Sequence, residues 1–353
     1  MIDQELQENI EGKEIKCVIW DLDNTLWDGT IVEDDDVRLK PGIIDTIKEL
    51  DSRGILHSIA SKNNHDDGIK KLKELGIAEY FLYPEINWNA KSVSIAKIQK
   101  NLNIGIDAMM FIDDQPFERD EVKNVHEHIT CVDSFEIPNL LSHKRLNPRF
   151  ITIDSKRRRQ MYIEEIKRKK EEEIFEGTPD KFLATLNLKF IIHEAREEDL
   201  KRAEELTVRT NQLNATGVTY TYEQLNAFRT SQNYIVLICE LTDVYGSYGK
   251  IGLALIEKKQ THWHLKLLLM SCRVMARGVG TVLLNYIMNE AKKEGKKLLA
   301  DFKKTSRNKM MYVSYKMANF KEIQSEDDTY ILFENDLSII QKYPPYIKLI
   351  IER

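Results

Sequence analysis

The sequence predicts a two-domain α/β chain, with a doubly wound parallel sheet in the first domain. Its 353 residues are about twice the length of a typical domain. Short apolar runs alternate with helix-period segments through the first half. A charge-dense segment then separates two halves of opposite net charge. The apolar fraction of 42% and the charged fraction of 31% exclude a disordered or collagenous chain.

The first domain is expected over residues 1–139. Apolar runs predict buried strands at 15–20, 55–60 and 108–112. Helical periodicity predicts helices at 42–53, 66–75 and 91–102, and Gly54 and Gly76 stand where helix C-caps belong. This order of elements implies parallel strands joined by right-handed crossovers.

A charged linker is expected over residues 140–177, because Lys, Arg and Glu dominate 156–173. Its simplest interpretation is a solvated connecting helix, and the alternative is a basic recognition arm. The second domain is expected over 178–340, followed by a C-terminal tail at 341–353. Its predicted strands and helices are 189–192, 198–208, 234–241, 250–257, 262–270, 278–294, 297–302, 309–317 and 330–333.

The charge distribution bears on partners and compartment. Residues 1–150 hold 18 Lys and Arg against 29 Asp and Glu, net −11, which leaves net +6 for the remainder. The acidic half suits a cation and the basic half an anionic partner, while a nucleic-acid partner is not expected. The longest apolar run, 234–239, is far shorter than the roughly 20 residues of a membrane span. The acidic residues 1–5 do not resemble a signal peptide, so a cytoplasmic location is expected.

Cysteine spacing favours neither a zinc site nor a disulfide framework. The four cysteines are far apart and form no C-x-x-C motif: Cys17, Cys131, Cys239 and Cys272.

Polar residues follow the predicted strands at one edge of the first sheet. Asp21 and Asp23 follow the first strand, Ser61 follows the second, and Asp113 with Asp114 follows the third. Lys91 starts a helix between the last two strands. Ligands bind at the carboxyl ends of parallel strands, and converging carboxylates favour a hard cation such as Mg²⁺.

This arrangement predicts phosphoryl chemistry. Asp21 is suited to in-line attack on phosphorus, and Asp23, two residues on, to donating a proton to the leaving oxygen. Ser61 supplies a hydroxyl and Lys91 a positive charge for the non-bridging oxygens.

These residues resemble the four motifs of the haloacid dehalogenase (HAD) superfamily. The resemblance implies Mg²⁺ held by the carboxylates of Asp21 and Asp113 and the carbonyl of Asp23, with Asp114 beside them, and an aspartyl-phosphate at Asp21. The gaps between motifs leave no room for a lid domain, so a capless site is expected, closed by the second domain or by a protein partner. The motifs also imply a phosphate-binding set that comprises Asn24, Thr25, Ser61, Lys62, Asn63 and Lys91.

Longer strings at 16–27, 87–91, 102–105 and 111–119 resemble the FkbH-like proteins of polyketide and related pathways. This resemblance implies a small phosphorylated acyl donor, 1,3-bisphosphoglycerate. Phosphate is lost and the glyceryl group passes to an acyl carrier protein. Ala60 stands where some members carry Cys.

In the second domain a strand at 262–270 leads into a glycine-rich turn that opens a helix, and such a turn suits a pyrophosphate. This layout, with Asn308 and Tyr315 farther along the chain, is similar to the GNAT acyltransferases, a family of α+β fold. Met275 and Asn319 depart from the usual pattern, so phosphopantetheine is expected as an alternative to a CoA thioester. The residues implied for either ligand are Arg273, Arg277, Gly278, Gly280, Thr281, Asn308 and Tyr315.

Cys272 is the candidate acyl-carrying nucleophile, because Arg273, Arg277 and a helix N-terminus are expected to favour its thiolate. Its alternative interpretation is a small buried apolar residue. Tyr220 and the His262/His264 pair have no assigned role.

The sequence thus predicts a Mg²⁺-dependent enzyme that loads a glyceryl group onto an acyl carrier protein. The alternatives are a Mg²⁺-dependent phosphatase fused to a CoA-dependent N-acetyltransferase, and a second domain that only docks carrier proteins.

Overall fold

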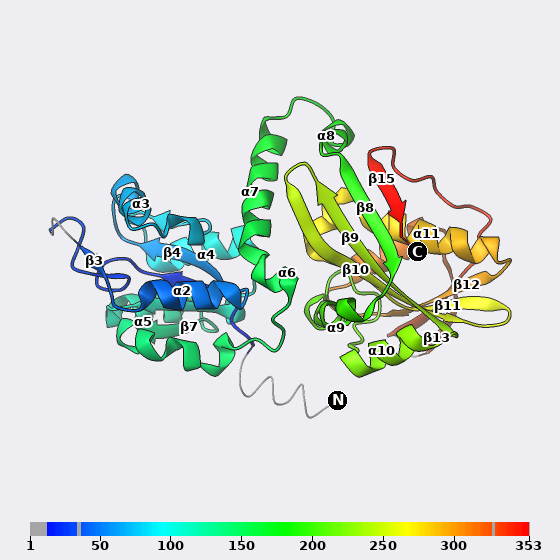
Figure 1. Cartoon of the computed structure of the whole chain (residues 1–353), viewed down its shortest axis with the longest axis horizontal. Helices are drawn as coiled ribbons and strands as arrows, with labels where there is room; N and C mark the ends of the chain where they lie inside the picture. Colours follow the sequence, from blue (N-terminus) through cyan, green and yellow to red (C-terminus); the bar gives the residue numbers. More distant parts are fainter. Residues whose placement is uncertain (1–12, 34–36, 327–328, 353) are drawn as a thin grey trace. The chain divides into compact units, whose positions relative to one another are not determined.

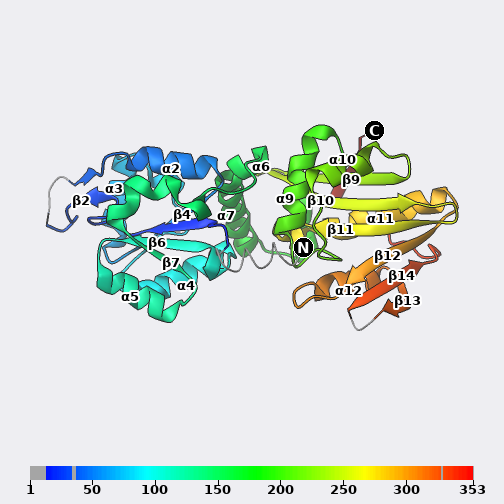
Figure 2. The same cartoon turned by 90° about the horizontal axis from the view of Figure 1, so that it is seen from below.

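The computed structural model describes residues 13–33, 37–326 and 329–352 and divides into two compact units between Ile163 and Glu164 (Figures 1 and 2). The first unit holds a five-stranded sheet and the second an eight-stranded sheet. The acidic N-terminal stretch, 1–5, lies outside the described residues. Within the described ranges, no helix has the length and apolar content that crossing a bilayer requires.

The first sheet is parallel throughout, in the order β5-β4-β1-β6-β7. Every residue of β1, β4 and β6 is buried, as expected for strands with helices on both faces. The three predicted strands are confirmed, with ends that differ by one or two residues. The two edge strands were not predicted, because β5 has two residues and β7 is only half-buried. The bounds are β1 Cys17–Trp20, β4 Leu56–Ser61, β5 Glu85–Ile86, β6 Met109–Asp113 and β7 Thr130–Asp133.

Three predicted helices surround this sheet: α2 Ile43–Ser52, α3 His65–Glu74 and α4 Lys91–Leu102. Gly54 and Gly76 follow α2 and α3 with φ of 78° and 69°, a left-handed conformation that favours glycine. The helix α5 Pro116–Val125 was not predicted.

The first domain is capless in the part that the structure describes. Between β1 and β4 the chain forms the hairpin β2 Trp27–Asp28 and β3 Arg38–Leu39, followed by α2. Between β4 and α4 it forms α3, a short η1 Ala78–Tyr80 and β5. Neither stretch contains a lid-sized domain.

The second sheet runs β13-β14-β12-β11-β10-β9-β8-β15 and is mixed. Only β11 with β12 and β8 with β15 pair in parallel. The segment expected as a C-terminal tail contains β15, which adds to the sheet edge beside β8. The bounds are β8 Leu188–Glu194, β9 Tyr234–Asp243, β10 Gly246–Lys258, β11 His262–Met270, β12 Lys297–Lys303, β13 Lys321–Glu326, β14 Tyr330–Asn335 and β15 Ile347–Ile351.

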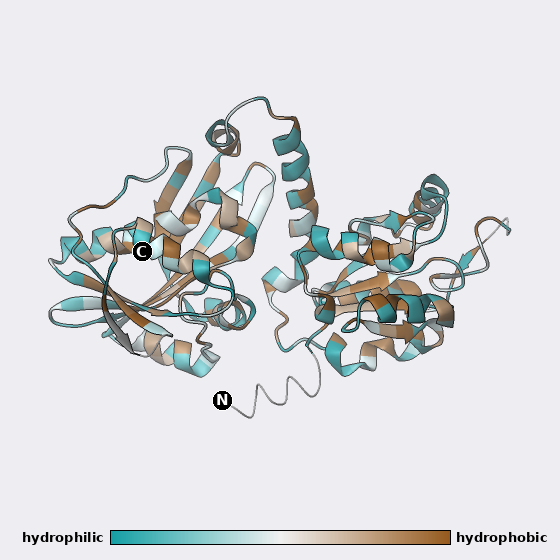
Figure 3. Cartoon of the chain, turned by 180° about the vertical axis from the view of Figure 1, so that it is seen from behind, coloured by the Kyte–Doolittle hydropathy of each residue, from teal (hydrophilic) through white to brown (hydrophobic). Residues whose placement is uncertain are grey.

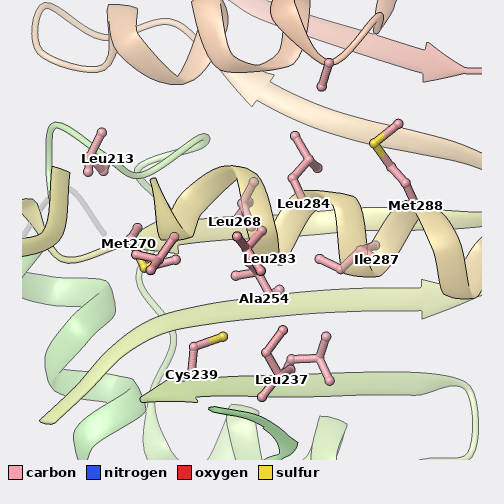
Figure 4. Close-up of a cluster of buried hydrophobic side chains, with 14 of the residues drawn as sticks. Leu213, Leu237, Cys239, Ala254, Leu268, Met270, Leu283, Leu284, Ile287 and Met288 are labelled. Carbon is pink, nitrogen blue, oxygen red and sulfur yellow. The ribbon is translucent and has the colours of Figure 1, made fainter. Parts of the chain in front are cut away.

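Helices cover both faces of the second sheet, which gives the predicted GNAT-like α+β fold. On one face lies α11 Val279–Lys293, and its Leu283 and Ile287 belong to the same buried apolar cluster as Leu268 of β11 (Figure 4). On the other face α9 Leu200–Arg209 and α10 Tyr222–Thr230 pack in a separate apolar cluster. The remaining helices are α8 Pro179–Thr185 and α12 Lys309–Met317.

The predicted charged linker contains η3 Ser134–Ser142 in part, η4 Lys144–Leu146, α6 Ile153–Lys156 and α7 Arg158–Ile174. The C-terminal part of α7 is mostly hydrophilic (Figure 3).

The prediction of a simply solvated helix is wrong for one turn of α7. Arg168 is 1% exposed, and its Nε and Nη2 lie 2.6 and 3.0 Å from the carboxylate of Asp243. Its guanidinium also lies 4.0 Å from the ring centroid of Tyr248. A charge run does not reveal such a partner, because Asp243 is 75 residues away in sequence.

Candidate active site

The carboxyl edge of the first sheet brings together the predicted catalytic side chains. Asp21 directly follows β1, while Ser61 and Asp113 are the last residues of β4 and β6. Because β4, β1 and β6 are neighbours, these ends meet. Lys91, the first residue of α4, completes the group. All four side chains are buried.

The ammonium of Lys91 lies between two carboxylates. Its Nζ is 2.8 Å from Oδ1 of Asp21 and also contacts Oδ2 of Asp113. Burial raises the pKa of Asp21 to about 6, although Lys91 opposes the shift. Burial acts to lower the pKa of Lys91, but the two carboxylates outweigh it and hold the pKa above its usual value. Lys91 is therefore a fixed positive charge at the base of the site.

The donor set at this edge fits a divalent cation. Asp21, Asp113 and Asp114 each offer a carboxylate oxygen, and these atoms lie within 4.8 Å of one another. Burial and the charge of Asp113 raise the pKa of Asp114, which indicates incompletely balanced negative charge. Three carboxylates and one ammonium leave two negative charges, and hard oxygen donors with that balance suit Mg²⁺.

Backbone and hydroxyl contacts fix the two carboxylates that follow β6. The N–H of Gln115 donates to Oδ1 of Asp113 at 2.8 Å, and the N–H of Asp114 donates to Oγ1 of Thr25 at 3.1 Å. Thr25 is fully buried and is engaged in this bond. Its hydroxyl therefore positions the loop of Asp114, whereas the motif implied phosphate contact.

Asp23 is held apart from the carboxylate cluster by three donors. Its Oδ2 accepts a bond from Nδ2 of Asn63 at 2.8 Å, and its Oδ1 accepts from Nε1 of Trp27 at 2.8 Å and from the N–H of Ile31 at 3.2 Å. These bonds fix the orientation of the carboxyl group that is predicted to donate a proton.

The other predicted phosphate-binding side chains have internal partners. Lys62 forms an ion pair with Glu118 at 2.8 Å, and Oδ1 of Asn24 accepts a bond from the N–H of Gly29 at 3.1 Å. Glu118 also lies 3.7 Å from Lys91, so it belongs to the site. It was missed among the candidate residues, although it lies in the string 111–119.

The thiol of Cys272 is in a different environment from the one predicted. Burial raises its pKa, and the backbone N–H groups of Gln212 and Leu213 oppose this only in part. Arg273 donates to the carbonyl of Tyr248 at 3.1 Å. Arg277 is buried and faces two glutamates of α7, Glu165 at 3.5 Å and Glu172 at 3.6 Å. The expected stabilisation of a thiolate by these arginines is therefore wrong.

Two residues predicted to face CoA or pantetheine lie in the protein interior. The amide of Asn308 is fully buried and donates to the carbonyls of Asn214 and Lys303 at 3.0 and 2.9 Å. Tyr315 is also fully buried, against Phe320 and Phe333, and burial raises the pKa of its hydroxyl. In this structure both side chains are buried, and the Tyr315 hydroxyl has no hydrogen-bond partner among the described residues.

The glycine-rich turn has the predicted form. Gly278 is the N-cap of α11 with φ of 76°, and a Cβ at Gly280 would meet open space. Thr281 is exposed on the first turn of α11.

The parallel sheet and the carboxylate site define a HAD-like domain of phosphatase type, which is followed along the chain by a second domain built on a mixed sheet. The chain is 30% identical over 137 residues to human Magnesium-dependent phosphatase 1, and the match covers 76% of that protein and 33% of this chain. The chain belongs to the family of this phosphatase. No protein-family model matches the chain.

Two solved structures are similar to parts of the chain. One is the N-terminal part of a Bacteroides fragilis protein, containing a phosphatase domain complexed with Mg; it is 30% identical with a TM-score of 0.34. The match covers 41% of this chain and only 43% of that structure. The other is an acetyltransferase of the GNAT family from Streptococcus pneumoniae, 19% identical with a TM-score of 0.33, covering 41% of this chain and 98% of that one.

Proposed function

We propose that this chain is an FkbH-like enzyme. Its first domain removes phosphate from 1,3-bisphosphoglycerate, and the glyceryl group passes to an acyl carrier protein. The main support for the proposed removal of phosphate is the buried Lys91 ammonium, which lies between Asp21 and Asp113 at a capless sheet edge. The strings at 87–91 and 111–119 support the FkbH-like assignment, since they contain Lys91, Asp113 and Glu118.

Asp21 is the nucleophile in this mechanism. Its carboxylate forms a bond to the phosphorus of the 3-phosphate while the bond from that phosphorus to the C3 oxygen of the glyceryl group breaks, which gives an aspartyl-phosphate that water then hydrolyses to inorganic phosphate. The acyl phosphate at C1 stays intact in this step, and its carbon–oxygen bond breaks, with release of phosphate, when the acceptor thiol attacks the acyl carbon. Asp23, oriented by Asn63 and Trp27, gives its proton to the leaving oxygen. Lys91 and the Ser61 hydroxyl stabilise the negative charge on the non-bridging oxygens.

Mg²⁺ is the cofactor that the donor set fits. Asp21, Asp113 and Asp114 would hold it through carboxylate oxygens, with the carbonyl of Asp23 as a further ligand. When bound, it supplies charge neutralisation for the phosphoryl group.

The acyl acceptor in this proposal is the phosphopantetheine thiol of an acyl carrier protein. Carrier proteins are generally acidic, and residues 151–353 carry a net charge of +6. Complementary charge of this kind speeds encounter between proteins.

A second candidate function is a Mg²⁺-dependent phosphatase fused to a CoA-dependent N-acetyltransferase. The turn at Gly278 and Gly280 favours it, because it opens the 15-residue α11 and a Cβ at Gly280 would meet open space. Calorimetric titration with acetyl-CoA tests this candidate. Saturable binding supports it.

The main proposal is tested by incubating the chain with 1,3-bisphosphoglycerate, Mg²⁺ and a phosphopantetheinylated carrier protein. Intact-mass spectrometry is expected to show a glyceryl group on the carrier protein. The Asp21→Asn variant is expected to lose phosphate release by roughly 10⁴-fold or more, because an amide does not attack phosphorus.

Asp45→Asn is the matched control, since Asp45 is exposed on α2. Phosphate release by Asp21→Asn at the rate of this control would remove Asp21 from the mechanism. An unmodified carrier protein after turnover of 1,3-bisphosphoglycerate would contradict the acyl-transfer part.

A further inference from the structure

The outer edge of β15 is unpaired in the part of the chain that the structure describes. β15 is the last strand of the eight-stranded sheet, and it lies beside β8 (Figure 1). The two strands pair in parallel over five residues without a register shift. Sheet edges are commonly protected by proline, by a bulge or by charged residues. β15 has neither proline nor bulge, and Lys348 is its one charged residue.

One hydrogen bond shows which backbone groups of β15 point outward. The N–H of Glu352, directly after β15, donates to the carbonyl of Ile192 of β8 at 3.0 Å. The backbone groups of alternate residues point to opposite sides of a strand, so those of Ile350 also face β8. Leu349 and Ile351 therefore direct their N–H and C=O groups to the outer edge. Among the described residues, no hydrogen bond to these outward groups is formed.

The side chains along this edge are apolar and partly exposed. Ile351 is 41% exposed, and Leu349 and Ile350 are half-buried. Leu349 packs against the core cluster that includes α11, and Ile350 lies on the opposite face of the sheet. An apolar edge with available backbone groups is a template for a further strand.

The charges of this edge complement themselves. Lys348 and Glu352 are both exposed and lie on one face, with Ile350 midway between them. When two β15 strands pair antiparallel about a two-fold axis at Ile350, Lys348 of each copy lies opposite Glu352 of the other copy. Glu352 also forms an exposed ion pair with Arg196 at 3.2 Å. A carboxylate accepts several hydrogen bonds, so this pair does not prevent a second cation from binding.

The backbone and the charges agree on a single register among three neighbouring ones. An axis at Leu349 places Lys348 opposite Ile350, and an axis at Ile351 places Glu352 opposite Ile350. Both of these registers leave the charges unpaired. An axis at Ile350 pairs the charges and brings Leu349 opposite Ile351, so that their outward N–H and C=O groups bond across the two copies.

We propose that β15 is a homodimer interface, at which two copies of this chain pair antiparallel about a two-fold axis at Ile350. The partner is a second copy, because a lysine, three apolar residues and a glutamate complement themselves under two-fold symmetry. Opposite charges and apolar side chains that face each other across two strands stabilise a sheet. The contact is short, so a weak dimer in exchange with monomer is expected. This inference does not depend on the proposed function.

The first test is sedimentation equilibrium of the full chain from about 1 to 200 µM, the range in which weak dimers exchange. The fitted mass is expected to rise with concentration toward twice the mass of one chain. Lys348→Glu and, separately, Glu352→Lys place like charges opposite each other at both ends of the contact. Each variant is expected to weaken the dimer about 10-fold or more. Lys342→Glu makes the same charge change at an exposed position before β15 and is expected to dimerise as the wild type does.

Mixing the two charge variants tests the register. In a mixed dimer of Lys348→Glu with Glu352→Lys, opposite charges face each other again at both ends. Mixed dimers are therefore expected at about the wild-type affinity, measured by energy transfer between differently labelled copies. A chain that carries both substitutions is expected to regain self-association for the same reason. Misfolding of a variant would not be repaired by mixing.

Ile350→Cys tests the position of the two-fold axis. Opposite residues that do not hydrogen-bond to each other have Cα atoms about 4.5 Å apart, which a disulfide spans. Mild oxidation is expected to crosslink two copies of this variant. Ile339→Cys, at an exposed position before β15, and the wild type are the controls and are expected to stay uncrosslinked.

The outcomes decide the proposal. The mass of one chain at every concentration overturns it, and so does a dimer that Lys348→Glu weakens no more than Lys342→Glu. Mixed charge variants that fail to associate also overturn it. Association restored by mixing, together with the Ile350→Cys crosslink, supports the two-fold pairing of β15.

Discussion

His57 is expected to make the first domain sensitive to acid. It is fully buried on β4, its Nδ1 accepts a bond from Nε1 of Trp20 at 3.0 Å, and its Nε2 donates to the carbonyl of Ile47 at 3.1 Å. Both nitrogens are thus used by the neutral ring. Burial lowers its pKa from 6.5 to about 3.

The sign and size of the effect on the free energy of unfolding follow from the difference between the ordinary pKa of histidine and the lowered pKa of His57 in the folded protein. Between pH 6.5 and 3 the unfolded chain binds a proton at this position and the folded chain does not. The stabilisation is therefore complete above pH 6.5 and is lost as the pH falls toward 3. At about 1.4 kcal/mol per pH unit, His57 contributes a loss of about 2 kcal/mol between pH 6.5 and 4.5.

The assay is urea unfolding followed by far-UV circular dichroism at several pH values in that window. His57→Gln keeps one donor and one acceptor but does not titrate, so its free energy of unfolding is expected to fall less steeply with acid than that of the wild type. His65→Gln, at an exposed position on α3, is the matched control and is expected to follow the wild type. Equal pH dependence of wild type and His57→Gln would refute the reasoning. Trp20 directly precedes Asp21, so phosphate release is expected to fall over the same pH range.

Three further predictions concern the second domain. Arg168→Met is expected to lower the free energy of unfolding by about 3–5 kcal/mol in urea titrations, because it leaves the carboxylate of Asp243 buried without its cation; an effect no larger than that of the exposed Lys167→Ala would contradict this. Carrier-protein loading is expected to weaken as salt rises, since exposed charges are screened over about 8 Å at physiological ionic strength; a Michaelis constant for carrier protein that does not change with salt would count against the charge argument. If the glyceryl group passes through the thiol of Cys272, Cys272→Ala is expected to keep phosphate release at Asp21 and to lose carrier-protein loading. In that case, mass mapping of the wild type without carrier protein is expected to show a glyceryl adduct on the peptide that contains Cys272. Normal loading by the variant would identify direct transfer to the carrier thiol.

The sequence alone predicted four side chains of the carboxyl-edge site, although it missed Glu118. Asp21 directly follows β1, Ser61 and Asp113 end β4 and β6, and Lys91 starts α4; strand ends of a parallel sheet meet at one edge. The positions of these residues relative to the predicted strands and helix therefore predict that their side chains lie close together. The same local signals predicted the glycine-rich turn before α11, since Gly278 adopts a positive φ that glycine favours.

Only the tertiary structure decided the contacts between distant residues. Arg168 finds Asp243 across 75 residues, and Asn308 reaches the carbonyl of Asn214 across 94. His264 and Asp301, separated by 37 residues, become neighbours because β11 and β12 pair in parallel. Burial and strand register set these partners and the pKa values that follow from them, and neither is encoded in the spacing of residues along the chain. Sequence pattern thus predicted which side chains meet at the edge of the first sheet, whereas strand pairing decided which polar residues of the second domain become buried neighbours.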